Sequence, residues 1–112
     1  MKRAAIALAL ILPAGCISSG IFARVDVACG ATALVFSNAS KLDETISVEV
    51  TDRCTGNDSE VQLVKANGTV VQTFLVPDGT TKSIKLNVPN GDYLNFVCNG
   101  SEGGCSYAIT SH

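Results

Sequence analysis

Apolar and polar residues alternate with a period of two from Val25 to the end of the chain. Residues 45–51 give the clearest example, and residues 83–88 repeat the pattern. Such alternation is typical of half-buried β-strands. The two apolar faces consist of Ile46, Val48, Val50, Ile84, Leu86 and Val88. One open sheet could not hide both faces, whereas two packed sheets can.

Turn-forming residues divide this part of the chain into short strands. Asn67-Gly68, between two apolar runs, predicts a hairpin with a type I′ turn. No helical period of 3.6 residues occurs after residue 23. The periodicity and turns predict about eight strands, at residues 24–28, 33–37, 45–51, 60–66, 69–76, 83–88, 93–98 and 105–110. We therefore expect an all-β fold, a small antiparallel β-sandwich of about seven or eight strands.

The first 23 residues differ from the rest. Lys2 and Arg3 precede an uncharged apolar run, residues 4–12, and then small and turn-forming residues. This is the pattern of a secretory signal peptide. Nine residues of helix would span less than half of a membrane's hydrocarbon core, which is roughly 30 Å thick. We predict that residues 1–23 are a cleaved leader and that residues 24–112 form one domain.

The site of cleavage decides the fate of Cys16. Ala14, Gly15 and Cys16 resemble the lipobox of bacterial lipoproteins, although Pro13 stands where that family usually has leucine. The resemblance implies removal of residues 1–15 and lipidation of Cys16. The alternative is an ordinary signal-peptidase site after Ala23, which would discard Cys16. The protein is then exported either as a membrane-anchored lipoprotein or in secreted or periplasmic form.

Either outcome withdraws Cys16 from the five cysteines of the chain. Four cysteines in a small exported domain predict two disulfides, with three connectivities open. We favour Cys98–Cys105 with Cys29–Cys54, because the former pair would close a short hairpin. We predict no metal site, since the sequence has no CxxC pair and its one histidine is the last residue.

Charge excludes one class of partner. The chain has eight basic and ten acidic residues, and removing Lys2 and Arg3 leaves six basic residues and a net charge of −4. A nucleic-acid-binding surface would need a basic stripe, which is absent from the sequence. We expect no nucleic-acid partner, and contact with a membrane only through a lipidated N-terminus.

The sequence gives little indication of catalysis. No catalytic triad can be built without a well-placed histidine, and we predict no catalytic residue, no cofactor and no enzymatic activity. Asp52, Asp58 and Glu60 lie in an oxygen-rich segment, but their spacing does not fit a calcium loop. We expect these carboxylates to be solvated surface charges.

The glycine-rich segment between the last two cysteines is the candidate binding loop. Asn99, Gly100, Ser101 and Glu102 could contact a ligand or a protein target. The alternative, which we favour, is a flexible hairpin loop whose glycines permit the bridge to close. Four glycosylation sequons, at Asn38, Asn57, Asn67 and Asn99, also fall in predicted turns or at strand ends.

Part of the chain resembles the strand–turn–strand sequence pattern of immunoglobulin-like and fibronectin-like modules of bacterial surface proteins. The residues that carry the resemblance are 76–79, 84–88 and 89–93. The resemblance implies an immunoglobulin-like sandwich, although the chain lacks a core tryptophan and Tyr93 lies five residues before Cys98. We expect a non-enzymatic exported envelope or cell-surface accessory module that binds a protein or envelope partner. The alternative is a small secreted inhibitor or effector that presents the Cys98–Cys105 loop. Residues 70–76 are apolar enough to form an adhesive edge if they lie outermost.

Overall fold

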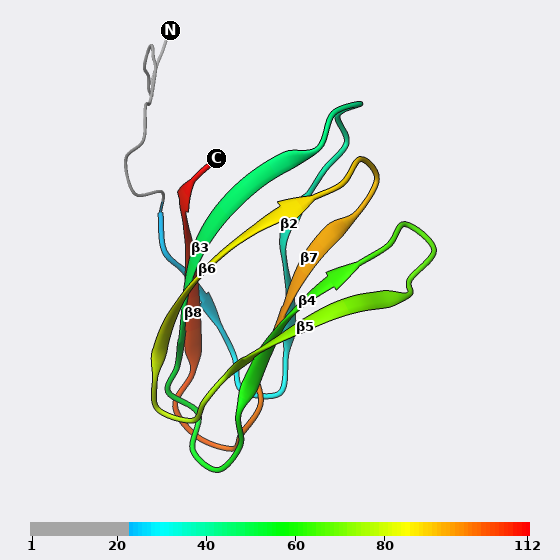
Figure 1. Cartoon of the computed structure of the whole chain (residues 1–112). Coiled ribbons are helices and arrows are strands. Elements are labelled where there is room, and N and C mark those ends of the chain that lie inside the picture. The colour runs from blue at the N-terminus through cyan, green and yellow to red at the C-terminus, as the bar shows by residue number, and fades with distance from the viewer. Residues whose placement is uncertain (1–22) are drawn as a thin grey trace, which may run out of the picture.

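A computed structural model describes residues 23–112, and these form eight β-strands (Figure 1). Residues 1–22 of the predicted leader, Cys16 among them, lie outside the described residues. The strands match the eight predicted from periodicity. They are β1 (Val25–Val27), β2 (Thr32–Ser37), β3 (Glu44–Asp52), β4 (Ser59–Val64), β5 (Val70–Val76), β6 (Thr81–Val88), β7 (Tyr93–Val97) and β8 (Cys105–Ser111). Within residues 23–112, no helix is long and apolar enough to cross a membrane.

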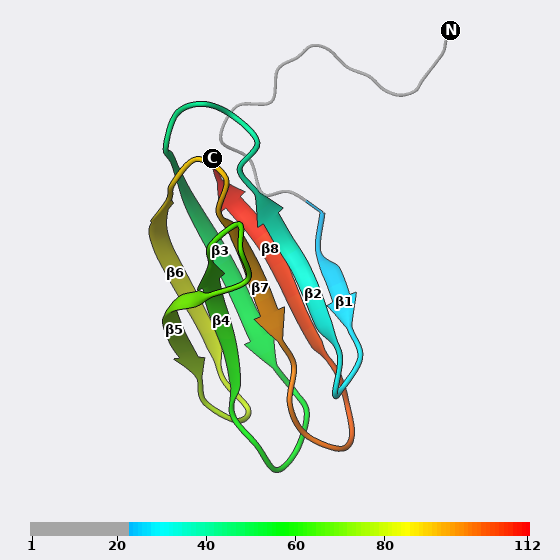
Figure 2. The same cartoon turned by 90° about the vertical axis from the view of Figure 1, so that its right-hand side faces the viewer.

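The strands form two four-stranded antiparallel sheets that face each other (Figure 2). The first sheet has the order β1-β8-β3-β6, and the second has the order β2-β7-β4-β5. The predicted β-sandwich is confirmed. The four outer strands are therefore β1 and β6 in the first sheet, and β2 and β5 in the second.

The strand order is that of a jelly roll. β1 pairs with β8, β2 with β7, β3 with β6 and β4 with β5, as in one long hairpin rolled up on itself. Only the β4–β5 connection stays within one sheet. An immunoglobulin fold would instead pair its first two strands, so this β-sandwich differs from an immunoglobulin domain in its strand order. Alternation determines which face of a strand is buried, but it does not choose the neighbouring strand.

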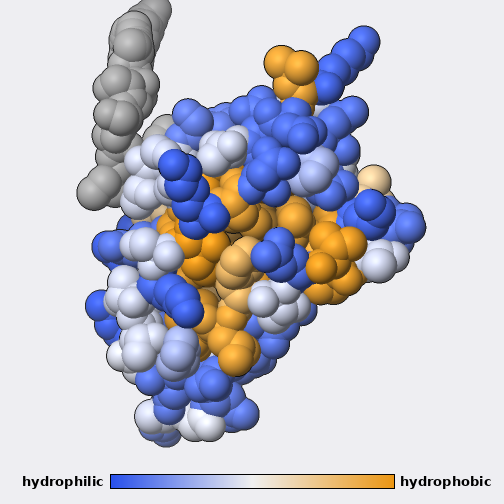
Figure 3. Space-filling view, viewed as in Figure 1, coloured by the Kyte–Doolittle hydropathy of each residue, from blue (hydrophilic) through white to orange (hydrophobic). Residues whose placement is uncertain are grey.

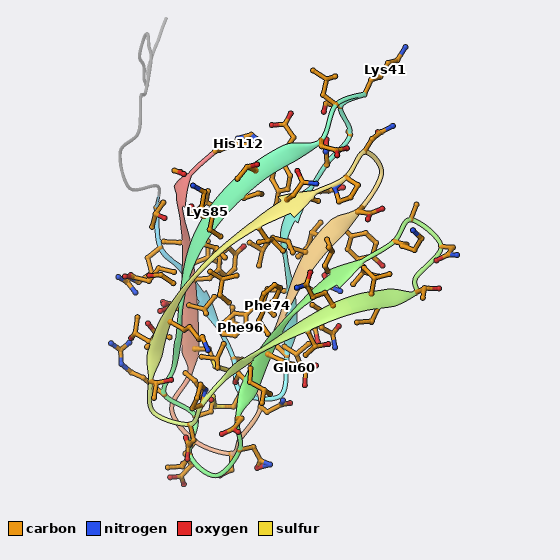
Figure 4. The ribbon with its side chains drawn as sticks, in the orientation of Figure 1. Lys41, Glu60, Phe74, Lys85, Phe96 and His112 are labelled. Carbon is orange, nitrogen blue, oxygen red and sulfur yellow. A yellow bond between two sulfur atoms is a disulfide. The ribbon has the colours of Figure 1, made fainter. Side chains whose placement is uncertain are left out.

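The core lies between the sheets and uses both of the predicted apolar faces. Ile46 and Val48 of β3 are fully buried, as is Phe96 of β7. The Phe96 ring meets Tyr107 of β8 edge-on, with ring centroids 6.4 Å apart, so an aromatic pair joins the two sheets. Phe74 of β5 points inward toward the same region (Figure 4) and packs against the core.

The β4–β5 hairpin forms where Asn67-Gly68 predicted it, but its turn is not type I′. The Gly68 N–H donates to the Lys65 carbonyl, and the Lys65 N–H donates to the Thr69 carbonyl. These bonds define a three-residue loop with Gly68 at a φ of +92°, the arrangement of a type I turn followed by a bulge. The Asn67 side chain accepts the Thr69 N–H at 2.9 Å, the donor that a type I′ turn would have used.

Candidate functional site

Both predicted disulfides are present, and both lie at one end of the sandwich. The first disulfide joins Cys29, in the β1–β2 turn, to Cys54, just after β3. The second disulfide joins Cys98, just after β7, to Cys105, at the start of β8. The Cys54 and Cys98 sulfurs are 3.0 Å apart, so the two bridges form one buried cluster. Sulfurs bonded to each other cannot act as thiolate ligands for a metal.

A buried carboxylate supports this cluster. Asp52 is fully buried, so the expectation that it would be a solvated charge was wrong. Its carboxylate accepts the Cys54 N–H at 2.8 Å and the Ser59 hydroxyl at 3.0 Å. The Ser59 oxygen in turn accepts the Asn99 N–H at 3.0 Å. The period of two would have placed Asp52 on the same face as Val50, and this signal was overlooked because the residue is acidic.

The other two carboxylates of the segment behave differently. Asp58 is exposed and Glu60 is half-buried. Asp58 accepts the Asp78 N–H at 2.9 Å, and the Asp78 carboxylate accepts the Gly56 N–H at 3.2 Å. Asp58 and Asp78 therefore join one surface turn to another through these hydrogen bonds.

The candidate binding loop is held against the segment after β3. The Arg53 N–H donates to the Gly104 carbonyl, and the Thr55 N–H donates to the Glu102 carbonyl, each at 3.0 Å. The Ser101 N–H donates back to the Thr55 carbonyl at 3.1 Å. Because main-chain bonds fix it on both sides, the expected flexible loop is instead a docked one.

The glycines of this loop allow that close approach. A Cβ at Gly100 would lie 2.6 Å from the Cβ of Cys54, and one at Gly103 would lie 2.1 Å from the Arg53 oxygen. The Asn99 amide donates to the Asp58 carbonyl at 3.0 Å. Ser101 and Glu102 have exposed side chains. Of the four candidate binding residues, these two therefore offer side chains to solvent.

An open hollow of about 480 Å³ lies beside the loop and is lined by the end of β1, the start of β8 and the segment after β3. Asp26, Arg53 and Gly104 are among the residues that line it. Asp26 and Arg53 are both exposed, so its charged groups stand on the rim.

His112 follows the last residue of β8 (Figure 4), whereas the sulfur cluster lies at the start of that strand. Its Nε2 is 3.1 Å from the Glu44 carboxylate, and its ring meets Phe36 edge-on at 5.0 Å between centroids. The ring is thus oriented by neighbours on two other strands. In the described part of the chain, its polar contact is this half-buried carboxylate.

The buried Asn38 serves the fold. Its amide donates to the Leu42 and Val88 carbonyls at 2.8 Å, and its oxygen accepts the Ser40 N–H and hydroxyl. With both ends of the amide occupied, this sequon is closed to a glycan in the folded protein.

β5 lies outermost in its sheet (Figure 1), which meets the condition set for an adhesive edge. Val70, Val71 and Leu75 are 45%, 49% and 55% exposed. In the space-filling view, hydrophobic surface gathers between the β5 and β6 edges (Figure 3). The side chains of Thr73 and Leu75 point away from the core, because they lie opposite Gln62 and Glu60.

The fold and this geometry define a class: a small all-β jelly-roll sandwich stapled at one end by two disulfides. No protein-family model matches the chain, and no curated protein matches it. Among solved structures, it is similar to one described as the crystal structure of PirA, with a TM-score of 0.58 and 18% identity over 80% of this chain and 92% of that one.

It is also similar to a structure described as Bacillus endospore appendages that form a family of disulfide-linked pili. That match has a TM-score of 0.50 and 17% identity, and it covers 89% of this chain and 98% of the other. At these identities the similarities show the fold.

Proposed function

We propose that this chain is an exported, non-enzymatic module of the cell envelope or cell surface that works by contacting other proteins. The observation that carries the proposal is the uncharged, outermost strand β5 on a disulfide-stapled sandwich. Structural disulfides persist in oxidising compartments. An open strand edge offers unpaired main-chain donors and acceptors to another chain.

The polar groups of the described residues support the non-enzymatic part of the proposal. Asp52 and Asn38 are deeply buried polar side chains, and they satisfy main-chain and hydroxyl groups of the fold. His112 is a surface residue paired with Glu44. The proposal therefore assigns no catalytic residue and no cofactor.

Two maturation routes fit the start of the sandwich. Cleavage after Ala23 leaves β1 complete, since this strand begins at Val25. Lipidation of Cys16 leaves seven residues between the lipid and Arg24, with a reach of at most about 25 Å. On that route the sandwich stays close to the membrane, anchored by several acyl chains.

Metabolic labelling with palmitate, combined with the intact mass of the mature protein, tests the proposal. Acylated protein that begins at Cys16 supports the anchored module, and Cys16→Ser should abolish the label. Unmodified protein that begins at Arg24 supports the diffusible form. Retention of the full-length chain in the cytosol would overturn export altogether.

Thiol chemistry provides a second test of the exported state. Alkylation of the purified, unreduced protein should label no cysteine after Arg24. Labelling of two or more of these cysteines would contradict a disulfide-stapled module in its working compartment.

The docked loop supports the second candidate function, a small secreted inhibitor or effector. A loop fixed before binding loses less conformational entropy when it meets a target, and Ser101 and Glu102 are presented to solvent. Capture of one protein target that is lost with Glu102→Ala, but kept with Leu75→Lys on the β5 edge, would favour this candidate over the envelope module.

A further inference from the structure

The four open strand edges differ in how well they are protected against pairing with another chain. β6 has the exposed lysines Lys82 and Lys85, and edge lysines oppose strand addition. Lys82 lies opposite the buried Val50, so its charged side chain is on the core-facing side of the sheet, at its outer edge. β1 has only three residues, one of them Asp26.

β2 and β5 are the two edges without charge, and their pairing differs. The register of β2 with β7 is interrupted in mid-strand, between Leu34 and Phe36. The register of β5 with β4 also shifts, but near the N-terminal end of β5, at Val71, and it is unbroken from Gln72 to Val76. Because Val76 is buried and Phe74 packs on the core, this stretch is held in place while its outer edge stays open.

Charge around β5 is arranged with opposite signs at its two ends. Asp78 follows the C-terminal end of the strand, and Glu60 lies opposite Leu75. Lys65, in the hairpin turn, is the charged residue at the N-terminal end. A second β5 strand laid antiparallel would bring the acidic end of one copy beside the basic end of the other. A parallel arrangement would place like charges together.

We propose that β5 is a self-association edge, at which a second copy of this chain adds its own β5 antiparallel about a two-fold axis near Thr73. In this register Thr73 faces Thr73, and Val71 of each copy faces Leu75 of the other. No like charges oppose each other within the strand pair. The result is one continuous eight-stranded sheet across two molecules, an isologous contact that closes on itself.

A single strand edge is smaller than the roughly 800 Å² per partner of a standard stable interface. The association is therefore weak in dilute solution and increases with concentration. It strengthens where copies are tethered side by side, because tethering raises their effective concentration.

Sedimentation velocity over a concentration series of the mature protein tests the inference with a matched pair of variants. Leu75→Lys should weaken dimerisation by about tenfold or more, because each dimer contains the new charge twice. Leu34→Lys, on the other uncharged edge and 57% exposed, should leave it unchanged. Circular dichroism checks that both variants fold.

Cysteine cross-linking tests the orientation. Under oxidation, a mixture of Val71→Cys and Leu75→Cys chains should give a covalent heterodimer, whereas Leu75→Cys alone should give little dimer. Monomers at every concentration, equal effects of the two lysine variants, or efficient Leu75→Cys cross-linking on its own would each overturn the inference. Such a failure leaves the proposed function intact, since the open β5 edge can still pair with a different protein, and export is tested separately by the processing of the chain.

Discussion

Replacing Gly103 with alanine should loosen the docking of the loop against the segment after β3. Gly103 has a φ of +112°, and its added Cβ would lie 2.1 Å from the Arg53 carbonyl oxygen. That oxygen belongs to rigid main chain, next to the sulfur cluster. The loop must therefore move away, which stretches the Arg53–Gly104 and Thr55–Glu102 hydrogen bonds on either side.

The expected loss of stability is the sum of a backbone-conformation cost and the cost of the lost hydrogen bonds. A non-glycine residue at positive φ costs about 1–2 kcal/mol, and each lost main-chain hydrogen bond costs about 1 kcal/mol. The free energy of unfolding should fall by about 3–4 kcal/mol. A domain of this size loses about 4–8 °C in Tm for each kcal/mol, so Tm should fall by about 12 °C or more.

Gly68→Ala is the matched control. Gly68 also has a positive φ, +92°, but a Cβ there would meet nothing within 4 Å. The Gly68→Ala variant should lose only about 1–2 kcal/mol in free energy of unfolding, the cost of a non-glycine residue at positive φ. Guanidinium unfolding of the oxidised proteins measures both losses. Equal losses would refute the docked loop, and so would fast amide exchange at Thr55 in the unsubstituted protein.

Three further stability predictions concern the staples, a buried amide and the core. Replacing both cysteines of the Cys29–Cys54 disulfide with serine should lower the free energy of unfolding by about 3.5 kcal/mol, because this disulfide closes the longer loop. The same replacement at the Cys98–Cys105 disulfide should lower it by about 2.5 kcal/mol. A larger loss for the second replacement than for the first, measured by guanidinium unfolding, would contradict this. Asn38→Ala should cost about 2–3 kcal/mol by leaving the buried Val88 carbonyl unpaired, and a loss below about 1 kcal/mol by thermal denaturation would argue against it. Phe96→Ala should cost about 3–5 kcal/mol and Leu75→Ala less than about 0.5 kcal/mol; similar denaturation midpoints for the two would be inconsistent with their burial.

Local properties of this fold could be predicted from the sequence. The period of two is clear in β3 and β6, and the residues assigned to their inner faces, such as Ile46 and Val88, are buried. The disulfide pairing was also predictable, because the spacing of Cys98 and Cys105 suits a hairpin loop. These features depend on residues that are close in sequence.

Features that depend on long-range pairing could not be predicted in the same way. Six of the seven connections cross from one sheet to the other, and the residues of a strand do not say which strand it will pair with. The docked loop was missed because its partners, Arg53 and Thr55, lie far away in sequence. The burial of Asp52 was not predicted, because its acidic side chain was given more weight than its position on the same face of the strand as Val50.

The disulfides and the open edge occupy different parts of the chain, and this arrangement has a physical consequence. Both disulfides are attached to segments that flank β1, β2, β3, β7 and β8, and none lies within the β4–β5 hairpin. An uncharged edge such as β5 promotes aggregation when a domain partly unfolds. Two cross-links that destabilise the unfolded chain reduce the population of such states. The disulfides at one end thus allow the sandwich to keep an unprotected strand at its edge.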